Sequence, residues 1–84
     1  MVSEVDAALE IGRDANALTA DLLRFARTLT HDAALAEDLV QETFARALAS
    51  ADRHRGDASV RTWMHRILHH LAIDGPDLQV RRDP

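Results

Sequence analysis

The side chains best suited to chemistry are concentrated between residues 53 and 70. Trp63, Arg66 and His70 follow a spacing of i, i+3, i+7, so on a helix they share one edge. An indole, a guanidinium and an imidazole along one edge can stack on unpaired bases and hold phosphate. The alternative is that the Trp63 ring belongs to the protein core while Arg66 and His70 are only solvated. The pattern leaves both interpretations open.

Two further histidines raise the question of a metal site or of catalysis. His65 and His69 stand at i and i+4, a spacing that can bring two imidazoles to one metal ion. No Glu lies between them as in the zinc-protease helix motif, and no third inward ligand is evident. No nucleophile–base arrangement, paired carboxylates or phosphate-binding glycine loop stands out. We therefore expect no enzyme activity and no metal or other cofactor.

Residues 36–48 contain no Gly or Pro and many strong helix formers, which predicts a helix. Its inward stripe is apolar: Ala36, Leu39, Val40, Thr43, Phe44 and Ala47. Its opposite face is acidic, amide-bearing or small: Asp38, Gln41, Glu42, Ala45 and Ala49. Small side chains beside carboxylates would let a basic partner helix approach closely. The alternative is an ordinary solvated helix face.

The apolar periodicity predicts an all-α fold, a compact bundle of three main helices at about 17–30, 33–50 and 59–73. A short N-terminal helix is expected at 3–11. Helix-capping residues precede each main helix: Asp14 or Asn16, then Asp32, then Ser59. Gly12 is expected to end the first helix, and residues 52–58 form a basic loop, a feature that is most often simply solvent-exposed.

The expected core comes from one stripe on each main helix. In the N-terminal helix, Val2, Val5 and Leu9 share a side, and the sequence leaves open how this helix docks. The next helix contributes Leu18, Leu22, Phe25, Ala26 and Leu29. The last helix contributes Val60, Trp63, Met64, Ile67, Leu68 and Leu71. Domain boundaries follow from these stripes: a lead-in at 1–15, a helical domain at 16–74 and a tail or linker start at 75–84.

Composition and charge narrow the classes of protein to which this chain can belong. The chain has 84 residues, enough for one domain, and a net charge of −4, which argues against a generic nucleic-acid binder. Residues 1–52 have a net charge of −6. Residues 53–84 have a net charge of +2 and contain four of the five histidines. One half could therefore face a basic protein and the other phosphate. Without cysteine, a signal peptide or a membrane-length apolar run, the expected location is the cytoplasm.

Two motifs resemble region 2 of the extracytoplasmic-function sigma factors, within the sigma-70 family. They are Ala-Glu-Asp-Leu-Val-Gln-Glu-Thr-Phe at 36–44 and Arg-Gly-Asp-Ala-Ser-Val-Arg-Thr-Trp-Met-His-Arg-Ile at 55–67. The resemblance covers about residues 21–74. It implies a helical domain that binds the clamp helices of the RNA polymerase β′ subunit. It further implies recognition and melting of the promoter −10 element, with a base of the non-template strand flipped into a protein pocket. It also implies an anti-sigma factor as a protein partner.

Carried over by position, the resemblance assigns polymerase contacts to the acidic face, at Asp38, Gln41, Glu42 and Ala45. It assigns the base pocket to Arg53, His54, Arg55, Gly56, Asp57, Ala58 and Ser59. It places Arg61, Arg66 and His70 against the strand, with Trp63 as a brace or wedge. This sequence departs from the family pattern at two places. Many family members carry Asn at the position of His70. Many also continue the last helix into a long basic helix, whereas Gly75 and Pro76 should stop the last helix here.

Three hypotheses follow. The first is a promoter-recognition domain that binds polymerase and single-stranded −10 DNA. The second is a shortened sigma-like interaction module that binds polymerase or an anti-sigma factor without productive promoter binding; the net acidity and Gly75–Pro76 favour it. The third is a metal-binding helical bundle.

Overall fold

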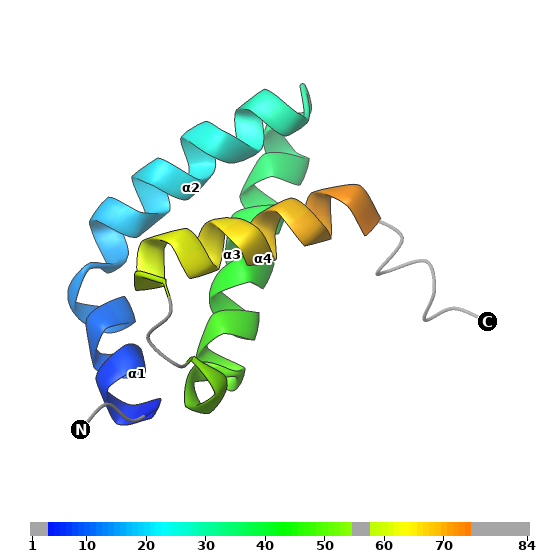
Figure 1. Cartoon of the computed structure of the whole chain (residues 1–84). Coiled ribbons are helices and arrows are strands. Elements are labelled where there is room, and N and C mark those ends of the chain that lie inside the picture. Colours follow the sequence, from blue (N-terminus) through cyan, green and yellow to red (C-terminus); the bar gives the residue numbers. More distant parts are fainter. Residues whose placement is uncertain (1–3, 55–57, 75–84) are drawn as a thin grey trace.

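The computed structural model describes residues 4–54 and 58–74, and every regular element among them is helical (Figure 1). The elements are α1 (Glu4–Arg13), α2 (Ala15–Leu29), α3 (Ala33–Ala49), the 3-10 turn η1 (Ala51–Arg53) and α4 (Val60–Asp74). The predicted all-α class is confirmed. The three main helices begin and end within two residues of the expected positions. The predicted stop at Gly75 and Pro76 lies outside the described residues.

The boundary between α1 and α2 differs from the prediction. α1 does not end at Gly12 but continues to Arg13, and a single residue, Asp14, separates it from α2. The N–H of Asp14 donates to the Glu10 carbonyl at 3.0 Å, and the Asp14 carbonyl accepts from the Leu18 N–H at 2.8 Å. Helical hydrogen bonding therefore runs through the junction, so glycine is not needed to end α1. Asp14 is the N-cap residue of α2, but its side chain makes no capping bond within the described structure.

The caps of the other two main helices are as predicted. The Asp32 carboxylate accepts the Leu35 N–H at 3.1 Å, at the start of α3. Ser59 Oγ accepts the Thr62 N–H at 3.1 Å, at the start of α4. Each bond satisfies one of the backbone donors that a helix N-terminus leaves without an intrahelical partner. These two caps determine where the helices that carry the predicted site residues begin.

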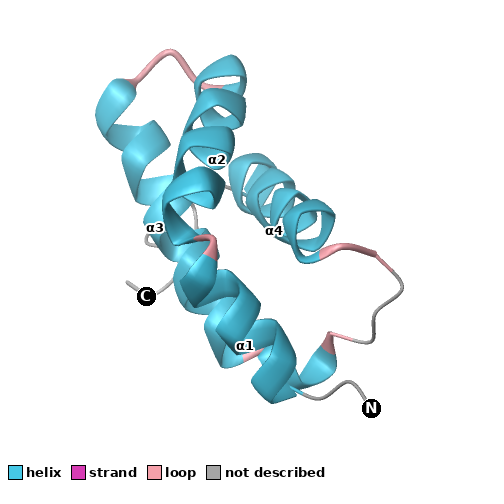
Figure 2. Cartoon of the chain, turned by 90° about the vertical axis from the view of Figure 1, so that its left-hand side faces the viewer, coloured by secondary structure: helices cyan, strands magenta, loops and turns pink. Residues whose placement is uncertain are grey.

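Helix α3 packs against both α2 and α4 and also contacts η1 (Figures 1 and 2). Its predicted inward stripe is confirmed: Ala36, Leu39, Val40, Thr43 and Ala47 are buried, and Phe44 is partly buried against them. The hydroxyl of Thr43 donates to the Leu39 carbonyl at 2.7 Å, so the buried oxygen is satisfied inside the helix. Leu22, Met64 and Leu68, each fully buried, complete the centre of the core.

One core prediction was wrong, at Leu29, and the side of α1 that carries Leu9 faces solvent. Leu9 is 60% exposed and Leu29 is 40% exposed. α1 packs its Ala7 and Ile11 side inward, because that side faces η1, α2 and α4. Leu29 is the last residue of α2, and the described residues leave that end of its stripe partly uncovered. No helix among the described residues has both the length and the apolarity needed to cross a membrane.

Candidate functional site: a basic hollow beside an acidic helix face

A surface hollow of about 320 Å³ lies where the last turns of α3 meet η1 and the middle of α4. Seven side chains line it: Arg46, Ser50, Arg53, Trp63, Ile67, His70 and Leu71. Three of them, Arg53, Trp63 and His70, were predicted as DNA-contacting residues. The hollow thus surrounds one indole with two guanidinium groups and an imidazole. Such an arrangement can stack on a flat ring and hold an anion at the same time.

Trp63 forms the apolar wall of this hollow. Its side chain is partly buried and packs against the hydrophobic core. Its ring also lies against the His54 ring, with centroids 4.8 Å apart and planes tilted by 44°. Trp63 therefore packs on the core and also lines the hollow, so its place in the core does not exclude a surface role; stacking on bases stays a prediction.

His54 connects the two ends of the predicted basic loop. Its Nε2 donates to the Ala58 carbonyl at 2.8 Å, which places the ring proton on that nitrogen if the imidazole is neutral. The other ring nitrogen, Nδ1, is buried and has no hydrogen-bond partner among the described residues. His54 is therefore a half-buried residue that follows η1 and contacts both Ala58 and, on α4, Trp63. It was also predicted to line the base pocket.

Of the remaining predicted pocket residues, the structure describes Ala58 and Ser59. Arg55, Gly56 and Asp57 lie outside the described residues. Ser59 is exposed and caps α4, and its hydroxyl also donates to Thr62 Oγ1 at 3.1 Å.

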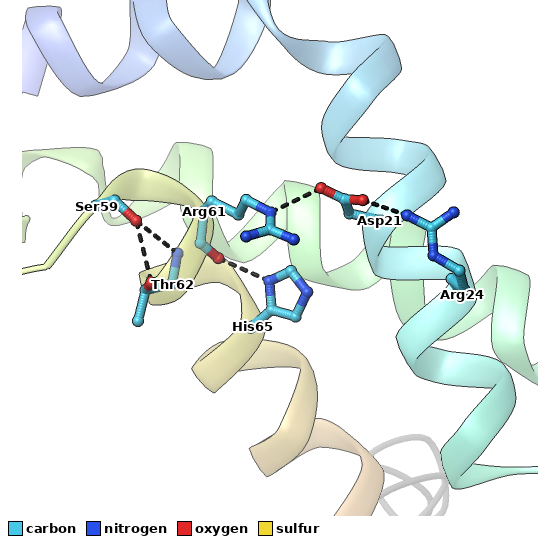
Figure 3. A network of polar contacts seen from close by, with 6 residues as sticks. All are labelled: Asp21, Arg24, Ser59, Arg61, Thr62 and His65. Carbon is cyan, nitrogen blue, oxygen red and sulfur yellow. Dashed lines mark hydrogen bonds and ion pairs between the residues drawn. The ribbon is translucent and has the colours of Figure 1, made fainter.

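Arg66 and Arg61 do not line the hollow. Arg66 is exposed on α4. Arg61 faces α2, where its Nε donates to Asp21 Oδ2 at 2.7 Å, and Arg24 donates to the other carboxylate oxygen at 2.5 Å (Figure 3). The structure therefore divides the predicted strand-facing residues between two flanks of α4, with Trp63 and His70 on one and Arg61 on the other.

The carboxylate of Asp21 is the charge that holds Arg61 on that flank. The Arg61 hydrogen bond lowers the pKa of Asp21; partial desolvation opposes this shift, and the charges of Arg61, Arg24 and His65 reinforce it. Only 23% of the Asp21 side chain is exposed. The contact joins residues 40 positions apart, so helix periodicity could not reveal it.

The two histidines with metal-ligand spacing also lie on the α2 flank. His65 Nδ1 is 2.8 Å from the Arg61 carbonyl, within α4 (Figure 3). The Phe25 ring lies 5.2 Å from the His65 ring and 6.5 Å from the His69 ring, measured between centroids. Within residues 4–54 and 58–74, no group of three or more His, Cys, Asp or Glu side chains comes together as a metal site. The metal-binding hypothesis therefore has no ligand set in this part of the chain.

The predicted acidic face is open to solvent on α3. Asp38, Gln41 and Ala45 are exposed, and 45% of the Glu42 side chain is exposed. On one side this face borders a second hollow, of about 230 Å³, between α2 and α3. That hollow is lined by Thr19, Leu23, Glu37, Val40 and Gln41. On the other side, Arg46 Nε donates to Glu42 Oε2 at 3.1 Å and continues into the basic hollow.

Sequence reasoning missed four residues that line the basic hollow: Arg46, Ser50, Ile67 and Leu71. The sequence could have indicated Arg46 and Ser50, because Glu42, Arg46 and Ser50 follow at i, i+4, i+8 and so share one edge of a helix. Ile67 and Leu71 were assigned to the core alone. Their contribution to a surface hollow depends on how α4 crosses α3, which the sequence does not determine.

Comparison with known families decides the identity of this fold. The Sigma-70 region 2 family matches residues 15–82. The chain belongs to the sigma-70 region 2 family. Within this region 2 domain, α2, α3, η1 and α4 all fall inside the matched range, whereas α1 precedes it.

Individual relatives of this region 2 domain are bacterial sigma factors. It is 39% identical over 54 residues to the RNA polymerase sigma factor YlaC of Bacillus subtilis (strain 168), covering 64% of this chain and 31% of that protein. It is 41% identical over 54 residues to the ECF RNA polymerase sigma factor SigC of Mycobacterium tuberculosis (strain CDC 1551 / Oshkosh), covering 64% of this chain and 29% of that protein. It is 39% identical over 54 residues to the ECF RNA polymerase sigma factor SigX of Bacillus subtilis (strain 168), covering 64% of this chain and 28% of that protein.

The matched region therefore spans less than a third of these relatives. The similarity identifies a region 2 domain of the kind found in ECF sigma factors. No solved structure matches the chain significantly.

Proposed function

We propose that this region 2 domain serves transcription initiation, by binding RNA polymerase through the outer face of α3 and single-stranded promoter −10 DNA through the basic hollow. The observation that carries the proposal is the hollow itself, in which Trp63 is flanked by Arg53 and His70. Family membership supplies the biological setting. The polymerase, in the cytoplasm, does the chemistry, and the domain acts as a non-enzymatic recognition unit.

The polymerase contact is supported by charge and shape on α3. Asp38 and Gln41 are exposed and lie next to the short side chain of Ala45. A basic partner helix can approach such a face closely, because no long side chain stands at Ala45 and the acids attract it. The β′ clamp helices are the partner that the resemblance implies. The face lies on a single helix, α3, which packs against both α2 and α4.

The DNA contact is supported by the combination of groups around the hollow. A base extruded from the stack loses a few kcal/mol of stacking, which a protein aromatic ring and nearby cations can offset. Trp63 offers the ring, Arg53 offers a permanent positive charge, and His70 offers hydrogen bonds to base or phosphate. The hollow measures about 320 Å³, a volume in the range of small-ligand sites and sufficient for one base.

The experiment that tests the DNA contact is a titration of the full chain into labelled single-stranded oligonucleotides, with the affinity measured at several salt concentrations. Arg53→Ala should weaken binding and reduce the salt slope by about 0.7, the value for one lost contact to single-strand phosphate. Arg13→Ala, on α1, removes the same charge outside the hollow and is the matched control. Equal affinities for the two variants would reject the hollow as the DNA site.

The experiment that tests the polymerase contact is capture of the chain by the isolated β′ clamp helices. Asp38→Arg reverses one charge on the outer face and should abolish capture. Asp14→Arg, in the α1–α2 junction, makes the same reversal elsewhere. Because both positions are exposed, neither variant should unfold the domain. Capture that survives Asp38→Arg would remove this face from the interface.

One observation favours the second hypothesis, a module that binds polymerase or an anti-sigma factor without promoter DNA. Arg61, expected to face the strand, is instead bound to Asp21 on the α2 flank. Fewer free cations then face the strand than the resemblance implies. The two experiments above separate the hypotheses, because only the first requires salt-dependent oligonucleotide binding in addition to capture by the clamp helices.

A further inference from the structure

Glu42 and Arg46 lie on the border between the two proposed binding surfaces. Glu42 belongs to the acidic face of α3, and Arg46 lines the basic hollow one helical turn later. The two are joined by a hydrogen bond of 3.1 Å from Arg46 Nε to Glu42 Oε2. A single ion pair therefore connects a surface proposed for protein with a surface proposed for DNA.

We propose that Arg46 binds a phosphate of the single strand in the hollow, and that Glu42 restrains Arg46 until polymerase engages Glu42. This inference rests on the proposed function, and it adds a DNA-contacting residue and a coupling between the two surfaces. Arg46 lies on the same wall as Ser50 and across the hollow from His70 on α4. A strand whose base reaches Trp63 must bring its backbone along these walls.

The ion pair is suited to a restraint that is easily released. Side-chain exposure is 47% for Arg46 and 45% for Glu42, so water competes for both groups. Only Nε of the guanidinium is bound to Glu42, and the group has four further N–H donors for a phosphate. A phosphate can compete with Glu42 for Arg46, because it can accept two parallel N–H bonds from a guanidinium, whereas Glu42 accepts only one here.

Coupling follows from the shared carboxylate. A basic group of the polymerase that binds Glu42 competes with Arg46 for the same carboxylate, so it favours release of the guanidinium to the strand. By thermodynamic linkage, DNA that takes Arg46 also frees Glu42 for polymerase, by the same factor. The factor is small, about twofold, because an exposed i, i+4 pair is weak.

The first test is a titration of the full chain against a fluorescein-labelled, mixed-sequence single-stranded DNA of about ten nucleotides, within the usual site size of such proteins. Arg46→Ala should lower the affinity about tenfold, the effect of one charge-assisted hydrogen bond, and flatten the salt slope by about 0.7. Arg27→Ala, an exposed arginine on α2 that does not line the hollow, is the matched control. If Arg46→Ala and Arg27→Ala bind alike, the inference is overturned while the proposed function stands. If the wild-type chain does not bind the oligonucleotide, both are overturned.

The second test addresses the restraint. Glu42→Gln should raise the DNA affinity about twofold, because it releases Arg46. Glu37→Gln removes the same charge from the same helix but lines the other hollow, so it should change the affinity less. In an Arg46→Ala background, Glu42→Gln should have no more effect than Glu37→Gln. A gain from Glu42→Gln that persists without Arg46 would show general charge repulsion and overturn the coupling.

Discussion

Replacing Trp63 by alanine tests the double role of this residue most directly. Removing a fully buried Trp side chain costs about 3–5 kcal/mol, and Trp63 is only partly buried, so about half of that applies. Loss of the ring contact with His54, at 4.8 Å, adds about 0.5–1 kcal/mol. We therefore expect Trp63→Ala to lower the free energy of unfolding by about 2–3 kcal/mol.

The stability measurement follows helix content by circular dichroism during thermal and urea unfolding. Trp63 is the only Trp and the chain has no Tyr, so fluorescence would be lost in the variant. For a domain of this size, 2–3 kcal/mol corresponds to a fall in Tm of about 10–20 °C. Trp63→Phe keeps a ring against the core and against His54, and should lose less than half as much. An unchanged Tm in Trp63→Ala would refute the packing argument.

The DNA measurement uses the same two variants below their unfolding temperatures. Loss of one base–ring stack costs about 1–3 kcal/mol, so Trp63→Ala should bind single-stranded DNA about 5- to 150-fold more weakly. Trp63→Phe should recover part of this affinity, because a phenyl ring can still stack. If the two variants bind equally weakly, stacking on residue 63 is rejected and the residue acts through packing alone.

Two other changes test packing and pH dependence. Ile11→Ala, at a side chain only 1% exposed, should cost about 2–4 kcal/mol in urea unfolding, whereas Leu9→Ala, on the exposed side of α1, should cost well under 1 kcal/mol. Equal losses would contradict the observed orientation of α1. The pKa of Asp21 is lowered in the folded state, from its ordinary value of 3.8. The ion pair with Arg61 therefore stabilises the fold at any pH above 3.8. This stabilisation is lost as the pH falls through the pKa that Asp21 has in the folded state. The Tm difference between wild type and Arg61→Gln should therefore be present near pH 7 and shrink as the pH falls below 3.8; a difference independent of pH would reject the ion pair as its source.

The sequence predicted the elements of this domain well where one signal acted alone. Apolar residues of α3 recur at helical spacing, so its inward and outward faces were both placed correctly. Asp32 and Ser59 were identified as caps because a short polar side chain before an apolar run satisfies the first free N–H groups. These features depend only on local spacing. The prediction failed for Leu29, and the sequence left open which side of α1 docks, because burial at both places depends on what another helix covers.

The site was predicted only in part, because it is assembled from distant segments. Trp63 and His70 share an edge of α4, which periodicity revealed. Arg46 reaches the same hollow from α3 only because α3 and α4 pack together. Arg61 was expected beside Trp63, yet its position on the helix turns it toward Asp21 on α2. A single helix projects side chains in all directions, so residues close in sequence can serve opposite flanks, whereas residues 24 apart can line one hollow.

The helix that precedes the family match completes the core behind the proposed DNA site. Ala7 and Ile11 of α1 are 2% and 1% exposed, and α1 packs against η1, where Ala51 is 4% exposed. η1 is only three residues long and carries Arg53, with His54 directly after it. So short a turn cannot hold its own position by hydrogen bonds alone, and the apolar contact with α1 orders it. The placement of Arg53 in the hollow therefore depends on apolar residues more than 40 positions earlier in the chain, on a helix that touches neither proposed ligand.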